Sequence, residues 1–130
     1  MKRQTEYWLK AAQDDLIVIR EIIRNDSLTN MVAFHSQQAI EKALKAVLEE
    51  KENHVPRMHN IITLKAMIDR YVTLNFNQEI FDQINELYID SRYPTDLGLL
   101  PDGKPSKEIA EEFFNITTNI FDQITEYLSE

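Results

Sequence analysis

A row of polar side chains between residues 31 and 48 is the best candidate for chemistry in this sequence. Its members recur every three or four residues, which places them on one face of a helix: His35, Gln38, Lys42 and Lys45. An imidazole, an amide and two ammonium groups in a line can bind an anion such as a phosphate. The alternative is a solvated helix face, stabilised by Glu41 and Lys45 four residues apart.

Two other motifs contain residues that can bind phosphate or transfer protons. Arg92 and Tyr93 stand before Pro94, and an Arg beside an aromatic ring can hold a phosphate and stack on a base. Arg92 equally suits the end of a helix, where a cation interacts with the last carbonyls. His59 precedes Asn60 and is either a base or a hydrogen-bonding residue at a helix start. We count Arg92, Tyr93 and His59 among the candidate ligand-binding residues.

Most familiar catalytic devices are absent from the sequence. Its two Gly residues cannot build a Gly-rich phosphate loop, and without Cys it has no thiol nucleophile, disulfide or thiolate metal site. His54 and His59 lie five residues apart across Pro56, which is not the spacing of a helical metal-ligand pair. No His follows an acidic residue by three positions, as a di-iron helical bundle requires. We therefore expect no metal, no cofactor and no catalytic residue.

Helices must position these residues, because the chain shows helical periodicity and no strand alternation. Five are expected: from about 5 to 24, from a cap at Thr29 or Asn30 to near Glu50, after a cap at Asn60, from about 78 to 91, and after a cap at Ser106. In the second helix, the face opposite the polar row is expected to enter a core: Ala33, Gln37, Ile40, Leu44 and Val47. The first helix is expected to bury a stripe and its flanks: Trp8, Ala12, Leu16, Ile19 and Ile23, with Leu9, Val18 and Ile22.

Length and the spacing of the breaks indicate one compact unit. The 130 residues suit a single domain, residues 1–130. Residues 94–105 form the one long irregular segment, since they hold both Gly and three of the four Pro. Five helices with mostly short connections predict an all-α, up-and-down antiparallel bundle of four to five helices.

Charge and hydropathy limit the surroundings and partners of the chain. Its start lacks an apolar run after Lys2 and Arg3, and no stretch of about 18 apolar residues occurs, so we expect a cytoplasmic protein without a membrane partner. Residues 1–70 hold 11 Lys and Arg against 10 Asp and Glu, whereas residues 71–130 hold 3 against 12. The net charge of −8 opposes steering toward DNA, so a nucleotide or RNA contact should be local to the first half. The acidic second half is either a solvated surface or suited to a basic partner.

Four motifs occur in order along the chain: Trp8-x3-Ala12-x2-Asp15-Leu16; Ala33-x-His35-x2-Gln38-x2-Glu41-Lys42-x-Leu44-Lys45; Pro56-x2-His59-x-Ile61-x2-Leu64; and Arg92-Tyr93-Pro94. Together they resemble the HEPN domain family (higher eukaryotes and prokaryotes nucleotide-binding). The resemblance implies a helical bundle similar to the C-terminal domain of kanamycin nucleotidyltransferase. It also implies a homodimer, encoded beside a minimal nucleotidyltransferase in a toxin–antitoxin-like pair.

Many HEPN proteins are metal-independent ribonucleases whose signature is an Arg, four to six residues, and a His. In this chain the positions at that distance from Arg92 are Leu97, Gly98 and Leu99, and no other Arg has a His at that spacing. The sequence therefore fits the nucleotide-binding, Arg-Tyr-Pro type of the family better than its ribonucleases.

Three functional hypotheses follow. The first is a non-catalytic module that binds a nucleotide, RNA or a nucleotidyltransferase partner in a groove of polar side chains: His35, Gln38, Lys42, Lys45, Arg92 and Tyr93. The second is a metal-independent ribonuclease in which His59 or His35 approaches Arg92 in space or across a dimer. The third is a bundle that only oligomerises, for which a two-fold homodimer is the commonest assembly.

Overall fold

The structure, a computed structural model, describes residues 1–91 and 104–130, with the backbone alone at 89–91. Within these ranges every regular element is a helix: α1 (Arg3–Ile22), the short 3₁₀ helix η1 (Asp26–Leu28), α2 (Thr29–Glu52), α3 (Ile61–Ile68), α4 (Gln78–Ser91) and α5 (Lys107–Leu128). The predicted all-α fold class is confirmed. The described part of the chain contains no helix long and apolar enough to cross a bilayer.

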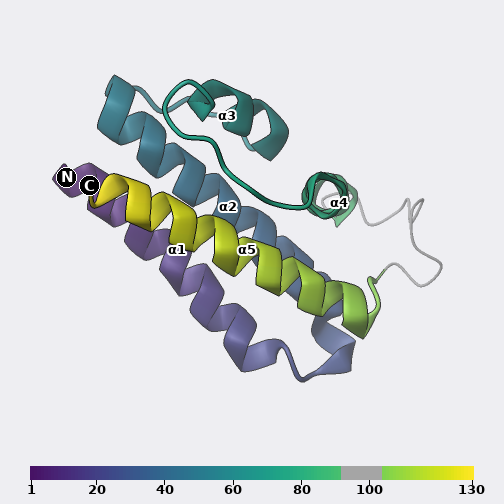
Figure 1. Cartoon of the computed structure of the whole chain (residues 1–130). Helices are drawn as coiled ribbons and strands as arrows, with labels where there is room; N and C mark the ends of the chain where they lie inside the picture. The colour runs from purple at the N-terminus through teal and green to yellow at the C-terminus, as the bar shows by residue number, and fades with distance from the viewer. Residues whose placement is uncertain (92–103) are drawn as a thin grey trace.

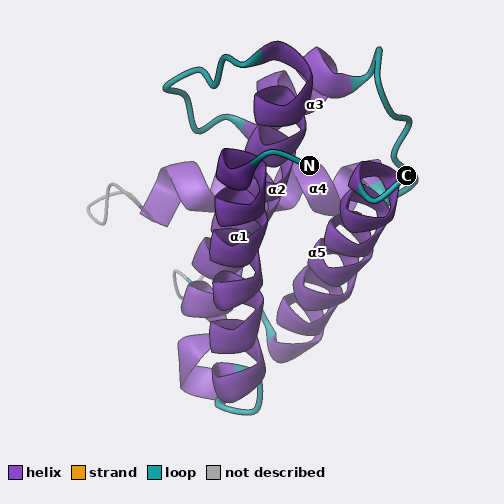
Figure 2. Cartoon of the chain, turned by 90° about the vertical axis from the view of Figure 1, so that its left-hand side faces the viewer, coloured by secondary structure: helices purple, strands orange, loops and turns teal. Residues whose placement is uncertain are grey.

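Three long helices, α1, α2 and α5, lie side by side and form the body of the molecule (Figures 1 and 2). α1 runs antiparallel to both α2 and α5, so the two chain ends lie at the same end of the bundle (Figures 1 and 2). α3 and α4 lie on the side of α2 away from α1, and α4 also contacts α5. α4 is seen nearly end-on in Figure 1 because it crosses the long helices instead of running along them. The connection from α2 to α4 through α3 is what brings α4 over the face of α2.

Two of the predicted helix starts are confirmed by their caps. The Asn60 side-chain oxygen accepts from the amides of Ile62 and Thr63 at the start of α3. The Ser106 hydroxyl oxygen accepts from the amide of Ile109 at the start of α5. Both caps satisfy amide groups that have no partner inside the helix.

The predicted cap of α2 at Thr29 or Asn30 is wrong. Thr29 is the first residue of α2 and has αR backbone angles, whereas a capping residue needs an extended backbone. The 3₁₀ helix η1 leads directly into α2, and Asn25 caps this turn by accepting from the amide of Ser27. The break predicted at 25–27 therefore exists, but the cap lies before η1.

α2 is the central helix and is covered on almost every side. Its buried side chains come from all around its circumference: Thr29, Val32, Ala33, Ser36, Gln37, Ala39, Ile40, Glu41, Ala43, Leu44, Lys45, Ala46, Val47 and Leu48. Small residues such as Ala39, Ala43 and Ala46 let the neighbouring helices approach its backbone closely. The expectation that only one face of this helix enters the core is therefore wrong.

α1 buries a stripe that differs from the predicted one at its edges. Ala12, Leu16 and Ile19 are in the core as expected, but Trp8 and Ile23 are only partly buried and Val18 is exposed. The acidic residue Asp15 is buried on this stripe instead. Its burial is explained by two partners that α2 supplies, His35 and Lys42.

Candidate functional site

Asp15 on α1 holds two cationic or ionisable side chains of α2. Its Oδ1 lies 2.8 Å from Nδ1 of His35, and its Oδ2 lies 2.7 Å from Nζ of Lys42. His35 and Lys42 are seven residues apart, which is two helical turns, so both face the same residue of the adjacent antiparallel helix. A carboxylate that is only 6% exposed is thus satisfied on both oxygens.

Glu41 on α2 forms a second cluster of hydrogen bonds, on a different face of the helix from His35 and Lys42. Its Oε2 accepts from Nζ of Lys45 at 2.9 Å and lies 3.1 Å from Nδ1 of His59. Gln37 donates to Glu41 Oε1 at 3.3 Å and to the backbone carbonyl of His59 at 2.6 Å. Gln38 in turn donates to the amide oxygen of Gln37 at 2.8 Å. These bonds fix the segment before α3 against α2.

Both imidazoles are held in the same way, by a carboxylate at Nδ1. A carboxylate only accepts, so each neutral ring must carry its proton on Nδ1, and its Nε2 is then an acceptor. Neither Nε2 is hydrogen-bonded to a residue in 1–88 or 104–130. The side chain of His59 is 53% exposed and that of His35 is 19% exposed, so His59 is the more accessible of the two.

Two aromatic rings connect the imidazoles across α2 and α4. Phe34 of α2 packs edge-on against His35 at 5.2 Å and stacks on Tyr88 of α4 at 5.8 Å between ring centroids. Tyr88 lies 6.4 Å from the ring of His59. The four rings therefore follow one another along the face where the C-terminal half of α4 crosses α2.

The predicted polar row is brought together, but its charges are largely paired. Lys42 and Lys45 each meet a carboxylate, and Lys45 is 5% exposed with its ammonium 5.7 Å from the centre of the Trp8 ring. The expected pairing of Glu41 and Lys45 is confirmed, while the expectation of a solvated face is wrong for Lys45. Because two carboxylates oppose two ammonium groups, the clusters offer little net positive charge to an anion.

Arg92 and Tyr93 lie outside the described residues, so the structure places five of the seven predicted ligand-binding residues: His35, Gln38, Lys42, Lys45 and His59. The two anchoring carboxylates were not predicted as part of the site. Asp15 carried a usable signal, since an acidic residue among Ala12, Leu16 and Ile19 on an apolar stripe requires a buried partner. In the described part of the chain no three His, Asp or Glu side chains converge as metal ligands would.

Comparison with known proteins decides the family. The HEPN domain profile matches residues 5–127. The chain belongs to the HEPN domain family. This HEPN protein is 30% identical, over an alignment of 139 residues, to "Putative toxin MJ1304" of Methanocaldococcus jannaschii, covering 98% of this chain and 90% of that protein.

A solved structure agrees with the family and the fold of this HEPN protein. The crystal structure of ST0689, an archaeal HEPN homologue, superposes with a TM-score of 0.69 at 27% identity. The match covers 97% of this chain and 98% of that one. The motif residues that carried the resemblance in the sequence, among them Asp15, His35, Glu41 and His59, are the ones that build the two carboxylate clusters.

Proposed function

We propose that this HEPN protein is a non-catalytic binding module of a toxin–antitoxin-like pair, acting in the cytoplasm. It receives a nucleotide or a short stretch of RNA on the face where α4 crosses α2. A minimal nucleotidyltransferase is the partner we expect. The relative named as a toxin supports the toxin–antitoxin context.

The observation that carries the ligand proposal is the pair of carboxylate-held imidazoles on either side of the Phe34–Tyr88 stack. An imidazole fixed at Nδ1 presents Nε2 to a ligand as an acceptor when neutral and as a donor when protonated. Tyr88 is buried and Phe34 is only partly exposed, so the half-exposed ring of His59 is the surface on which a nucleobase would stack. Since the Lys charges are paired, we assign the phosphate contact chiefly to Arg92, which follows Tyr88 by four residues in the sequence.

Titration calorimetry with ATP, the other nucleoside triphosphates and a short RNA tests the ligand proposal. Arg92→Ala and His59→Ala are each expected to weaken binding roughly tenfold, the usual effect of losing a hydrogen bond to a charged group. Arg57→Ala and His54→Ala are matched controls, because both residues are exposed and lie outside the two clusters. An absence of heat with every ligand would remove the ligand part of the proposal.

The partner part is tested separately, by purifying the tagged protein from its native host and identifying what comes with it by mass spectrometry. A nucleotidyltransferase in the eluate supports the proposal. A stable complex with only itself would instead favour a bundle that oligomerises without this partner.

A ribonuclease is the second candidate, and the exposure of His59 favours it. Its ring is half exposed while Glu41, buried, holds Nδ1 at 3.1 Å, an arrangement that orients Nε2 for proton transfer. Incubation with RNA in the presence of a chelator tests this. Cleavage that His59→Ala abolishes and His54→Ala retains would establish the activity, and intact RNA with the wild-type protein would exclude it.

A further inference from the structure

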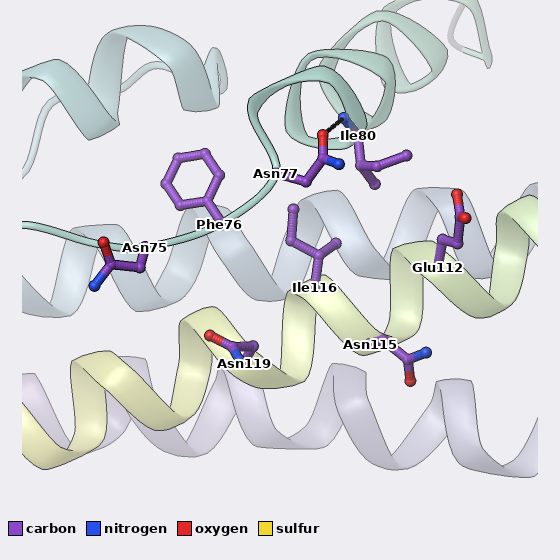
Figure 3. Close-up of a pocket in the computed structure, with 8 residues that line it drawn as sticks. All are labelled: Asn75, Phe76, Asn77, Ile80, Glu112, Asn115, Ile116 and Asn119. Carbon is purple, nitrogen blue, oxygen red and sulfur yellow. Dashed lines mark hydrogen bonds between the residues drawn. The ribbon is translucent and has the colours of Figure 1, made fainter.

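A hollow separate from the two carboxylate clusters lies between the segment preceding α4 and the middle of α5 (Figure 3). Its volume is about 340 Å³. The lining comes from the segment before α4 and its first turn (Asn75, Phe76, Asn77 and Ile80) and from one face of α5 (Glu112, Asn115, Ile116 and Asn119). An apolar floor is thus bordered by four carboxamides and one carboxylate, with no Lys or Arg among the lining residues.

α5 already recognises peptide backbone next to this hollow. Gln123 accepts from the backbone amide of Asn75 at 2.8 Å and donates to the carbonyl of the same residue at 2.7 Å. A side-chain amide carries one acceptor and a donor in the arrangement of a peptide group, so it can pair with both backbone groups of one residue. Gln123 therefore hydrogen-bonds to both backbone groups of residue 75, much as a neighbouring β-strand would.

Two more carboxamide side chains lie on the same face of α5, toward its N-terminus. Asn119 and Asn115 precede it by four and eight residues, so the three side chains stack along the helix. The Asn119 oxygen accepts from Gln123, and the Asn115 amide has no hydrogen bond within the described chain. The Asn77 oxygen caps the amide of Ile80 and leaves the nitrogen of that side chain available (Figure 3). Both donors and acceptors thus remain free along the hollow.

The charge around the hollow is negative. Glu112 lines it, and three more exposed acidic residues lie within four residues of a lining residue on the same helices: Glu79, Glu108 and Glu111. The exposed Lys107 at the start of α5 is paired with Asp26 at 4.0 Å. Lys65 contacts one lining residue, since its ammonium lies 5.7 Å from the centre of the Phe76 ring, but this charge is paired with Asp69 at 3.1 Å. An anionic ligand is disfavoured here, whereas an ammonium or guanidinium group is attracted.

We propose that this hollow binds an extended, Lys- or Arg-bearing peptide segment of a partner protein. The backbone of the segment pairs with the amides of Asn115 and Asn119 as residue 75 pairs with Gln123. A basic side chain of the segment faces Glu112, and an apolar one rests on Ile80 and Ile116. The proposal rests on none of the residues assigned above to nucleotide binding, so the two can succeed or fail independently.

Fluorescence anisotropy with three labelled hexapeptides tests the proposal. The probes are alternating Lys-Val, alternating Glu-Val, and the Lys-Val peptide with N-methylated backbone amides, which keeps the charge and loses the backbone donors. Only the first is expected to bind appreciably, and its affinity should fall as salt is raised. Equal binding of the N-methylated peptide, or of the acidic one, would overturn the proposal, as would no binding of the first.

Substitutions in the lining of the hollow test where the Lys-Val peptide binds. Asn115→Ala and Glu112→Gln are each expected to weaken the Lys-Val complex by roughly two- to fivefold, and together by more, as for exposed hydrogen bonds and ion pairs. Glu111→Gln removes the same charge from an exposed position outside the lining and should change the affinity less.

Nuclear magnetic resonance gives a readout that does not depend on variants. On addition of the Lys-Val peptide, the side-chain amide signals of Asn115, Asn119 and Asn77 are expected to shift, while that of Asn25, which caps η1 elsewhere, stays in place. Shifts confined to other parts of the protein would overturn the proposed location.

Discussion

Asp15 and Glu41 show how a carboxylate can be placed inside a small helical bundle. Each is about 5% exposed and bonded to one Lys and one His. Moving a charge out of water is unfavourable unless a partner and hydrogen bonds replace the solvent. The arrangement holds the two imidazoles with Nε2 unoccupied by the described residues, and it couples the candidate site to the packing of α1 on α2.

Replacing Glu41 by Gln is expected to destabilise the fold by about 3 kcal/mol, because Lys45 then keeps a buried charge without a counter-ion. Urea unfolding measures the loss. Glu49→Gln, on the same helix, is the matched control, because the Glu49 carboxylate accepts no hydrogen bond from the described residues; it should change the free energy of unfolding by less than about 0.5 kcal/mol. An equal effect of the two substitutions would contradict the assigned role of Glu41.

The tautomers of His35 and His59 can be observed directly. Both neutral rings are expected to carry the proton on Nδ1, because each Nδ1 faces a carboxylate that can only accept. Long-range ¹H–¹⁵N spectra of the imidazoles distinguish the two tautomers. A protonated Nε2 in the neutral ring of either residue would show that its carboxylate contact is not formed in solution.

At the scale of elements, α2 is the central helix against which the others pack, and α3 lies in the connection from α2 to α4. Fourteen of the residues of α2 are buried, so the helix is stabilised mainly by packing against α1, α5, α3 and α4. α3 has only 8 residues and is too short to be stable alone. Its position depends on three buried side chains, Ile61, Leu64 and Ile68, and on the Asn60 cap.

Asn60→Ala is expected to destabilise the protein by about 1 kcal/mol, because two amides of α3 lose their acceptor. Hydrogen exchange should show the loss of protection first in α3. Asn60→Ser, which can still cap, serves as the control. Unchanged exchange in α3 of Asn60→Ala would mean that packing alone holds this helix.

At the scale of the whole molecule, the start of α1 is fastened to the end of α2. The backbone amide of Lys2 and the hydroxyl of Thr5 both donate to Glu50, each at 2.9 Å. These two hydrogen bonds lower the pKa of Glu50 below its ordinary value of 4.5, and the bond from Lys2 has the larger effect.

The end of α2 is also bonded to the residues after α3. The side chains of Arg70 and Tyr71 both donate to Glu52 and lower the pKa of that carboxyl.

A lowered carboxyl pKa makes the folded state more stable above the ordinary value than below it. The unfolded chain binds protons more readily than the folded one as the pH falls through 4.5, so the contribution of Glu50 is present above that pH and is lost in acid. In Glu50→Gln the free energy of unfolding should therefore depend less on pH below about 4.5 than in the wild type. Denaturant unfolding at a series of pH values measures this dependence.

Thr5→Val removes one of the two donors and should reduce the pH dependence by a smaller amount than Glu50→Gln. The same slope in the wild type and in Glu50→Gln would show that the contact between the two helix ends does not form in solution.

Much of the fold was determined by the sequence alone. Periodicity gave α1 and α4 within about two residues, and the chemistry of Asn60 and Ser106 marked the starts of α3 and α5, because both signals are local and depend on a single helix. The four motifs also identified the family, which the profile match confirms.

Only the tertiary structure decided what the polar row does. The sequence places His35, Lys42 and Lys45 on one side of α2 and pairs Lys45 with Glu41. It does not show the buried carboxylate that meets His35 and Lys42, because Asp15 comes from another helix, 20 residues before His35. Nor could a single-helix pattern show that α2 is covered all round, since that depends on where α3 and α4 cross it. Local periodicity fixes which residues share a face, whereas the packing of helices distant in sequence fixes what that face meets.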